Sequence, residues 1–574
     1  MTRTPTGASV LRGSLGAFRG RLTAAAALFG GHQAGEALVP VLVGVVIDEA
    51  VGTGSTTALI GWLLVLGVDF AFLSTCYRFG ARQAWHADVH ADARLRMQLA
   101  DRLLDPRGGA EADRLPGSLA TVAVSDAKRV AIVNFMLPLG VAAIAAVTVS
   151  AIALLTISLP LGLLILLGTP PLLWLVHRVG KPLEKRSETE QERAAQASGV
   201  AADLVSGIRV LKGIGAERAA MAQYVGTSRT ALGATLRATR AEAGFLGSVQ
   251  LANGLFLALI ALVGGRLAVG GEISVGGLVA AVGLAQFLIG PLQVFGFVSA
   301  RLAQGRASAT RIAAVLTADH TVGAGHAAAP VGVPAGALAL RQVSGGGLDD
   351  LDLDVPAGQL LGVVAPDPVQ ASALLRCLGR ESEPESGRVE LDGTPLADYP
   401  PDLARAYVLV AVHDAHLFVG TLRDNVLAGG VPAGGVPAGR VADRDLDRVM
   451  AAAQADQAAE ALPQGRDTDI AARGSSLSGG QRQRVALARA LAADAPVLVL
   501  HDPTTAVDTV TEAEIAEGLR EVRHDRTTVL VTTSPALLAV TDRIVVLESG
   551  RIRTEGTHSD LLRNDPDYRA LVTG

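Results

Sequence analysis

A short run near the carboxyl end, residues 477–481, reads Leu-Ser-Gly-Gly-Gln and continues into an Arg- and Ala-rich stretch. A hydroxyl and two glycines at the start of a helix suit a phosphate, because a helix N-terminus carries unpaired N–H donors and partial positive charge. An apolar run at 497–500 follows, and then the segment His501-Asp-Pro-Thr-Thr-Ala-Val-Asp508. Chance could place Leu-Ser-Gly-Gly-Gln in a chain this rich in Ala and Gly, but not also at this distance before a buried strand and a Pro-Thr-x-Ala-x-Asp turn. These residues therefore suit the binding of an anion such as a phosphate at the start of a helix.

These three segments resemble the signature, the Walker B strand and the D-loop of ABC-transporter ATPase domains. In that family two ATPase domains pair head to tail, and each site joins the phosphate loop and Walker B strand of one domain to the signature of the other. The resemblance implies ATP and Mg²⁺ as cofactors, held mainly by the Walker motifs of the partner chain. It also implies that five residues of this chain serve the partner's site, namely Ser478, Gly479, Gly480, Gln481 and Asp508.

The chain's own phosphate loop has lost most of its chemistry. Such a loop needs glycines, so that backbone N–H groups can close around the phosphates, and a Lys to neutralise them. The resemblance places this loop in residues 365–375, with Ala371 at the lysine position and only the Mg²⁺-binding hydroxyl, Ser372, retained. Pro368 removes a donor N–H, and Asp367 puts negative charge where phosphate would sit. No substitute is available, since the carboxyl-terminal half of the chain contains no Lys.

Four further positions of the same site are changed on the family pattern: His413 replaces the Q-loop Gln, His501 the Mg²⁺-ligating Asp, Asp502 the general-base Glu and Thr533 the switch His. The shorter Asp side chain holds its carboxylate about one methylene further from the attacking water, which impairs general-base catalysis. The aromatic residue that would stack on adenine should lie in residues 343–347, which read Val-Ser-Gly-Gly-Gly. A metal site made of the two histidines is a weak alternative, because no further ligand spacing accompanies them, and none is predicted.

All the altered positions line the chain's own site on the family pattern, whereas the retained signature faces a partner. The pattern predicts one dead site beside one working site. A homodimer would have two dead sites, so the expected partner is a second, catalytically complete ABC half-transporter chain. Decay of the gene, or errors in the sequence, would not spare a contiguous signature while striking separated positions that converge on one site.

The composition of the chain limits its class. With 574 residues, 49% of them hydrophobic, and a mean hydropathy of +0.38, the chain is too long for one domain and too apolar for a soluble protein. The net charge of −5 and the lack of a basic tail argue against a nucleic-acid partner. Cys76 and Cys377 fall in different halves and are expected to be free thiols.

Six apolar stretches can each cross a bilayer of about 30 Å, which takes about 20 residues. The two long connections between them are dense in Arg and Lys, whereas the short connections contain a single basic residue, Arg266. The positive-inside rule therefore places the long connections, both termini and the ATPase domain in the cytoplasm. The predicted protein crosses the lipid bilayer of a bacterial plasma membrane several times. The predicted spans are about 22–48, 57–80, 131–157, 159–178, 245–268 and 275–299.

The order of spans and ATPase segment resembles the exporter type of ABC half-transporter over nearly the whole chain. Residues 104–129 and 207–218 resemble its two cytoplasmic coupling segments. A tandem Gly-Gly-Val-Pro-Ala repeat at 429–438 is expected to be a surface loop, since such a composition cannot bury a core. The resemblance implies a membrane all-α domain with six transmembrane helices at 1–316, a linker at 317–336 and an α/β ATPase domain of the P-loop type at 337–574.

Ionisable residues inside membrane spans are costly and point to function. His32 and Glu36 lie one helical turn apart in the first predicted span, and Asp69 lies in the middle of the second. These three residues are candidates to line a transport cavity. The alternative is interhelical hydrogen bonding that merely holds the spans together.

The sequence predicts a catalytically degenerate half of a heterodimeric ABC transporter. ATP hydrolysis at the partner's site would drive export of a small molecule, lipid or peptide, with the direction resting on fold analogy. One alternative is an exporter-fold importer of a metal chelate such as a siderophore. Another is a non-transporting regulatory subunit, which would need neither the signature nor the coupling segments. The missing Lys and general base disfavour an autonomous homodimeric ATPase, and the transported substrate stays open.

Overall fold

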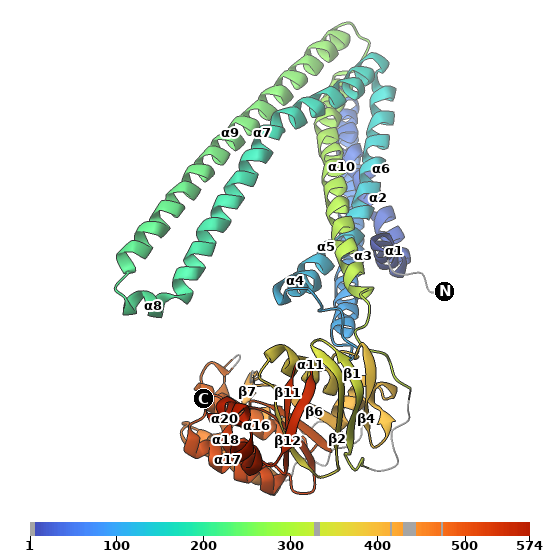
Figure 1. Cartoon of the computed structure of the whole chain (residues 1–574). Helices are drawn as coiled ribbons and strands as arrows, with labels where there is room; N and C mark the ends of the chain where they lie inside the picture. Colours follow the sequence, from blue (N-terminus) through green and yellow to red (C-terminus); the bar gives the residue numbers. More distant parts are fainter. Residues whose placement is uncertain (1–5, 327–332, 414–415, 429–442, 472–473, 574) are drawn as a thin grey trace. The chain divides into compact units, whose positions relative to one another are not determined.

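The structure, a computed structural model, consists of an all-helical unit and an α/β unit (Figure 1). The tandem repeat at 429–438 lies outside the residues that it describes. The described residues are 6–326, 333–413, 416–428, 443–471 and 474–573. The helical unit comprises Met1–Leu99 and Pro116–Thr317, and the α/β unit comprises Ala100–Leu115 and Ala318–Gly574.

Among the described residues, five long helical runs are apolar enough to cross a membrane by length and composition, and five of the six predicted spans fall within them. They are Thr56–Leu103, Pro116–Ile157, Leu159–Ser206, Glu217–Val269 and Val275–Leu316. All five continue as helix beyond their apolar stretches. The elements of the helical unit are α1 (Gly7–Ala17), α2 (Arg19–Val46), η1 (Ile47–Val51), α3 (Thr56–Leu103), α4 (Pro116–Thr121), η2 (Val122–Asp126), α5 (Ala127–Ala131), α6 (Val133–Ile157), α7 (Leu159–Ser206), α8 (Ile208–Gly213), α9 (Glu217–Val269) and α10 (Val275–Leu316).

The first predicted span, 22–48, is not confirmed as a membrane span. The chain forms a helix there, since α2 is 28 residues long and leads directly into the short π-helix η1. This helix is not among those apolar enough to cross a membrane by length and composition. The physical reason is the polar cluster around His32 and Glu36, which interrupts the apolar sequence in the middle of the helix.

Helices α2, α6 and α10 pack together along their lengths, whereas α7 and α9 form a hairpin with the short helix α8 at its tip (Figure 1). The hairpin joins the other helices near the turn between α6 and α7, where Leu161 and Ile165 are buried with Leu284. The rest of the hairpin stands apart from α2, α6 and α10. Helix α8 lies within the predicted second coupling segment, 207–218.

A close crossing of α2 and α10 depends on small residues, as is common between helices in membranes. A Cβ atom added to Gly44 would lie 2.5 Å from the carbonyl oxygen of Gly276, so neither helix tolerates a side chain there. Asp48 then accepts the Gly276 N–H at 2.8 Å, which satisfies a donor at the start of α10. The contact fixes the N-terminal end of α10 against the end of α2.

The α/β unit contains a six-stranded sheet in the order β12-β11-β3-β10-β9-β6 and a four-stranded antiparallel sheet in the order β2-β1-β4-β5. Strands β11, β3, β10, β9 and β6 are parallel. The elements are β1 (Leu338–Gly345), β2 (Leu348–Val355), β3 (Leu360–Val364), α11 (Pro368–Leu378), β4 (Ser386–Leu391), β5 (Thr394–Pro395), η3 (Leu396–Asp398), α12 (Pro401–Tyr407), β6 (Val408–Ala411), β7 (Gly420–Thr421), α13 (Leu422–Leu427), α14 (Asp443–Ala452), α15 (Ala455–Glu460), η5 (Gly465–Asp467), β8 (Asp469–Ile470), α16 (Gly479–Ala492), β9 (Val497–His501), α17 (Thr509–Val522), β10 (Thr527–Val531), α18 (Pro535–Ala539), β11 (Arg543–Glu548), β12 (Arg551–Gly556), α19 (His558–Asn564) and α20 (Pro566–Thr573).

The parallel strands gather the altered positions at one edge of the sheet. Strands β3, β9 and β10 are apolar and almost wholly buried, as expected for parallel strands that are covered on both faces. The loops that follow parallel strands meet at the carboxyl edge of the sheet, where ligands of α/β proteins usually bind. His413, Asp502 and Thr533 lie in the loops after β6, β9 and β10, His501 ends β9, and Ala371 lies in α11, the helix that follows β3.

Part of the predicted linker, 317–336, packs on the α/β unit. The buried Arg380 donates to the carbonyl oxygen of Gly323 at 3.0 Å, and Arg102 donates to the carbonyl oxygen of Ala318 at 2.8 Å. Both guanidinium groups belong to buried side chains, and these hydrogen bonds to backbone carbonyls give them partners. The start of the linker is therefore fixed to this unit.

Candidate functional site

The signature segment forms the start of α16. Ser478 caps this helix, since its Oγ accepts the Gln481 N–H at 3.2 Å while Gln481 Oε1 accepts the Ser478 N–H at 2.9 Å. The two residues form a reciprocal capping box. Ser478 is exposed, and Gly479 and Gly480 are only partly buried. The first turn of α16 thus presents a neutral, polar helix N-terminus that suits an anion.

A buried glutamine couples the signature helix to the loop after β9. Gln483 Nε2 donates to Thr505 Oγ1 at 2.6 Å, and Gln483 Oε1 accepts the Ala506 N–H at 2.8 Å. A Cβ atom on Gly480 would lie 2.7 Å from the Ala506 carbonyl oxygen, so the glycine permits this close approach. Sequence reasoning missed Gln483. The sequence pattern that could have identified it is a glutamine one helical turn before the buried Leu487, on the same face of the helix.

Asp508 ends the same loop and caps α17. Its carboxylate accepts the Thr511 N–H at 3.0 Å and the Thr511 hydroxyl at 2.9 Å. The backbone hydrogen bond from Thr511 is the main cause of a lowered pKa of Asp508, which is therefore ionised at neutral pH. The structure places this residue on an exposed helix cap.

At the start of α11, a carboxylate of the chain occupies the helix N-terminus. Asp367 Oδ1 accepts the Val369 N–H at 2.9 Å, and its Oδ2 accepts from Gln370 Nε2 at 3.3 Å. Pro368 stands at the first helical position and has no N–H to donate. Ala371 is buried in the core of the α/β unit, with 3% of its surface exposed. This N-terminus is therefore already neutralised by an internal anion.

Ser372 is exposed and lines a cleft of about 520 Å³ together with Gly345, Gly346, Arg376 and other residues. The glycines form the turn between β1 and β2 with φ values of 127° and 61°. A Cβ atom on Gly346 would lie 3.0 Å from Ala373 Cβ. The turn at the expected position of the adenine-stacking aromatic residue therefore packs closely on α11. Its glycines contribute no ring to the cleft.

The loop after β6 and the end of β9 bring two histidines together. His413 Nδ1 lies 3.4 Å from His501 Nδ1, and the two rings meet at 81°. The Oδ2 atom of Asp502 lies 3.7 Å from His501 Nε2, the other ring nitrogen. Burial lowers the pKa of His501, and His413 adds to this effect, while Asp502 opposes it. The imidazole of His501 is therefore neutral at physiological pH.

Thr533 lies in the loop between β10 and α18 and is exposed. Two residues before it, Val531 pairs with His501 in the parallel sheet and accepts the Asp502 N–H at 3.0 Å. His501, Asp502 and Thr533 thus follow neighbouring strand ends. Asp502 adopts a left-handed backbone conformation with φ of 42°, which aspartate tolerates better than most residues.

The three ionisable residues predicted in the membrane spans lie where α2 faces α3. His32 Nδ1 lies 2.9 Å from the Leu73 carbonyl oxygen, and His32 Nε2 lies 3.6 Å from Glu36 Oε2. Asp69 sits beside Gly35, because a Cβ atom there would lie 3.1 Å from Asp69 Oδ1. Asp69 Oδ2 is buried and has no hydrogen-bond partner among the described residues. Their lining of a transport cavity stays a prediction.

Both cysteines are buried and free, as predicted. Across the part of the chain that the structure describes, no group of three or more His, Cys, Asp or Glu side chains is arranged to hold a metal ion.

Comparison with known proteins assigns the chain to a family. Residues 22–292 match the family described as ABC transporter transmembrane region, and residues 348–505 match the family described as ABC transporter. The ATP-dependent lipid A-core flippase of Xylella fastidiosa (strain Temecula1 / ATCC 700964) is 30% identical over 419 residues, which cover 72% of this chain and 69% of the flippase. This chain belongs to the ABC transporter family.

Two further ABC proteins extend the likeness to nearly the whole chain. The multidrug efflux ATP-binding/permease protein of Mycobacterium bovis (strain BCG / Pasteur 1173P2) is 31% identical over 550 residues, which cover 93% of this chain and 45% of that protein. A solved structure of a bacterial Atm1-family ABC exporter with ATP bound matches with a TM-score of 0.72 and 24% identity, over 97% of this chain and 99% of that one. The chain is thus an ABC half-transporter of exporter type, with a membrane domain fused to an ATPase domain that implies binding of ATP with Mg²⁺.

Proposed function

We propose that this chain is the catalytically degenerate half of a heterodimeric ABC exporter. Its signature and D-loop serve the nucleotide site of a second, complete half, and ATP hydrolysis at that site drives transport. One observation carries the proposal. Within a single domain, Ser478 leaves the start of α16 open to an anion, whereas Asp367 fills the start of α11 with an anion of its own.

The residues of the chain's own site do not fit ATP with Mg²⁺. A phosphate at the start of α11 would lie close to the Asp367 carboxylate. Both groups are negatively charged, so they would repel each other. The lysine position, Ala371, carries a buried methyl group and no charge. His413 and His501 present imidazoles, whereas Mg²⁺ prefers oxygen ligands. We therefore route no catalytic step through this site.

The signature side retains an ordered and accessible geometry. Gln483 ties α16 to the loop after β9, and Asp508 caps α17 at the end of that loop. These contacts hold the signature and the D-loop in one fixed arrangement, which is the preorganisation that transition-state stabilisation requires. A domain that took no part in binding a nucleotide would gain nothing from holding the signature and the D-loop in this arrangement.

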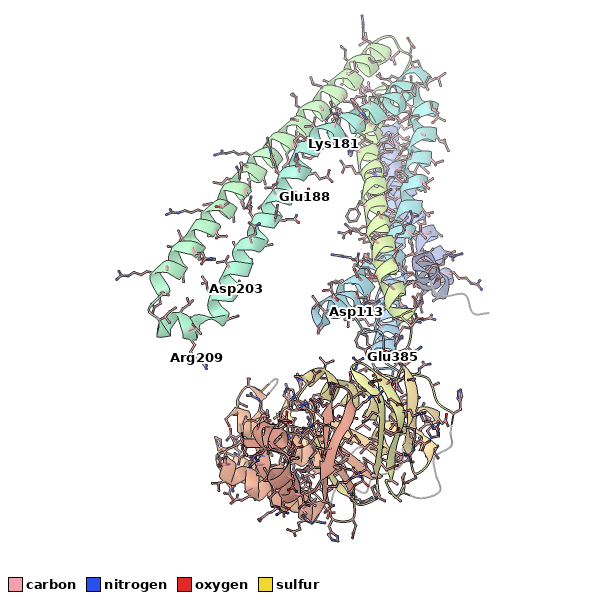
Figure 2. All side chains as sticks on the ribbon, in the orientation of Figure 1. Asp113, Lys181, Glu188, Asp203, Arg209 and Glu385 are labelled. Atoms are coloured by element: carbon pink, nitrogen blue, oxygen red, sulfur yellow. The ribbon has the colours of Figure 1, made fainter. Side chains whose placement is uncertain are left out.

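The membrane domain supports the need for a second chain. Figure 2 shows Lys181, Glu188 and Asp203 along α7, beyond the predicted span at 159–178, so this part of the hairpin lies outside the membrane in our proposal. It nevertheless exposes large apolar side chains, which soluble surfaces seldom gather unless a partner covers them. They are Val205, Ile208, Val210, Ile214, Met221, Leu232 and Leu236.

The half-transporter lies in a bacterial plasma membrane in this proposal, with the ATPase domain and both termini in the cytoplasm. The Arg- and Lys-rich long connections support that orientation. The named relatives are a lipid A-core flippase and a multidrug efflux protein. We infer export of a small molecule, lipid or peptide.

The proposal is tested by comparing the chain alone with the pair. The purified chain should show no basal ATPase activity, and coexpression with a complete ABC half from a neighbouring reading frame should give a stable pair that hydrolyses ATP. An Asp502→Ala variant of the single chain controls for contaminating ATPases. Turnover by the single chain that disappears in this variant would show a working own site and contradict the proposal.

A further inference from the structure

The histidine pair occupies two sequence-distant positions that the sheet brings into contact. His413 follows β6 and His501 ends β9, and these two strands are parallel neighbours, with Ala411 paired to Leu500. The two side chains reach the same point from adjacent strand ends, although 88 residues separate them in the sequence. Both nitrogen atoms at the contact are Nδ1 atoms.

The distance between these atoms fits a shared metal ion. Zinc–imidazole bonds of about 2.0–2.1 Å at a tetrahedral angle place two ligand nitrogens about 3.4 Å apart. The observed separation of the two Nδ1 atoms is 3.4 Å. Imidazole favours zinc, copper, nickel and iron, whereas Mg²⁺ favours carboxylate, carbonyl and water oxygens. The change of residue type therefore exchanges one class of metal for another at the same sheet edge.

A carboxylate stands behind one of the two rings. Asp502 Oδ2 lies 3.7 Å from His501 Nε2, on the side of the ring away from His413. Metal-binding histidines usually direct their other ring nitrogen to a carboxylate or carbonyl, which sets the tautomer and increases the basicity of the ligand nitrogen. Asp502 is itself held in place by the hydrogen bond from its N–H to the Val531 carbonyl oxygen, at 3.0 Å. His501 Nδ1 therefore faces His413 Nδ1, and a bound ion would replace the hydrogen bond between these two nitrogens at 3.4 Å.

The site is reachable from solvent and is not blocked by a neighbouring cation. His413 is exposed, and it lines a cleft of about 490 Å³ with His416, Arg489 and other residues. The Arg489 guanidinium is engaged elsewhere, because it donates to the His416 carbonyl oxygen at 3.0 Å and lies over the Phe418 ring. Water or a partner's side chain can complete the coordination of an ion held by two imidazoles.

We propose that His413 and His501 form a binding site for a divalent transition metal, zinc foremost, with Asp502 as the residue that orients His501. The inference concerns this chain alone and does not depend on its pairing with a second half. A bound ion ties the loop after β6 to the end of β9. It thereby fixes the part of the site that, in a complete ABC half, would respond to nucleotide.

The test uses the full chain, purified without a polyhistidine tag, in detergent and in a large excess of Mg²⁺. Titration with Zn²⁺ should show one saturable site per chain, and Co²⁺ should give the visible absorption of a nitrogen-ligated tetrahedral ion. His413→Gln and His501→Asp should each weaken binding by at least about tenfold, since even loss of an orienting residue costs about 10–100-fold. Asp502→Asn should weaken binding within that range.

His524→Gln is the matched control, because His524 forms an exposed pair with Asp525 at 2.9 Å and should leave zinc affinity unchanged. His413 is exposed, so H413Q should keep the wild-type unfolding temperature in the absence of metal. No saturable site, or a site that both His413→Gln and His501→Asp retain, would overturn the proposal. Neither result depends on ATP hydrolysis, so failure here is separable from failure of the heterodimer.

Discussion

The helices α11 and α16 begin in opposite ways within one ATPase domain. Helix α16 starts with a serine cap, two glycines and a glutamine, all uncharged. Helix α11 starts with an aspartate cap and a proline. Both N-termini satisfy their local backbone donors, so either arrangement makes a stable helix. The difference is electrostatic: one helix leaves its partial positive charge for an external anion, and the other cancels it internally.

The comparison shows that residues unsuited to phosphate at the start of α11 are compatible with the fold. An acidic cap stabilises a helix N-terminus by about 0.3–1 kcal/mol, so Asp367 favours the folded domain while it opposes phosphate. Ala371 likewise adds an apolar contact to the buried core. In our proposal the residues at the start of α11 stabilise the domain while they exclude phosphate, whereas the signature helix keeps residues that serve the partner's site.

The largest expected effect comes from placing the same charged residue at each helix. Ser478→Arg should reduce ATPase activity of the heterodimer by about 100-fold or more, because it removes the cap and blocks the approach of phosphate to α16. Ser372→Arg, in the second turn of α11, should change turnover by less than about twofold, since this residue meets no reacting phosphate. ATPase assays on the two purified pairs compare them directly. Equal losses of ATPase activity in both variants would contradict the proposed difference between α11 and α16.

A smaller loss is expected when the support behind the signature is removed. Gln483→Leu leaves the Ala506 N–H and the Thr505 hydroxyl without this partner and lets the D-loop shift relative to α16. A misplacement of about 1 Å can cost up to about 100-fold in rate, so turnover of the pair should fall by roughly 10–100-fold. Arg484→Gln, which loses a bond to the Gln454 carbonyl oxygen, is the control on the same helix. Wild-type turnover in Gln483→Leu would show that hydrolysis does not need this link between α16 and the D-loop.

The smallest effect on activity is expected from repairing the lost lysine. Ala371→Lys should leave the chain's own site inactive, because Asp367, His501 and Asp502 remain as they are. It should also destabilise the ATPase domain by about 1–3 kcal/mol, since the methyl group is buried in a packed core. Thermal unfolding of the purified chain measures this cost, and Ser372→Lys on the exposed neighbouring position should show none. Hydrolysis gained by Ala371→Lys would contradict our description of the site.

The sequence predicted the strand ends and the signature well, because these depend on short local patterns. A buried apolar run such as 497–500 identifies a parallel strand, and the turn after it must then lie at the edge of the sheet. The sequence predicted only the apolar part of each long helix. Helix α9 begins at Glu217, far before its apolar part at 245–268. Hydropathy does not register such polar helical turns.

The side-chain contacts within the site depend on which segments the fold brings together, so the sequence alone could not predict them. His413 and His501 meet only because β6 and β9 are neighbours in the sheet. The coupling of Gln483 to Ala506 requires the close approach that Gly480 permits. The first predicted span is not confirmed for a different reason, which lies in the composition of α2. The cluster of His32 and Glu36 makes α2 less apolar than the other five.

Nucleotide stoichiometry per heterodimer tests the central claim most directly. The pair is incubated with ATP and Mg²⁺ under conditions that trap the closed state, and bound nucleotide is then counted and located on each chain. One tightly held nucleotide, on the Walker motifs of the partner and against Ser478 of this chain, is the expected result. Two nucleotides, with the second beside Ser372, would show that α11 still accepts phosphate despite Asp367 and would contradict the account.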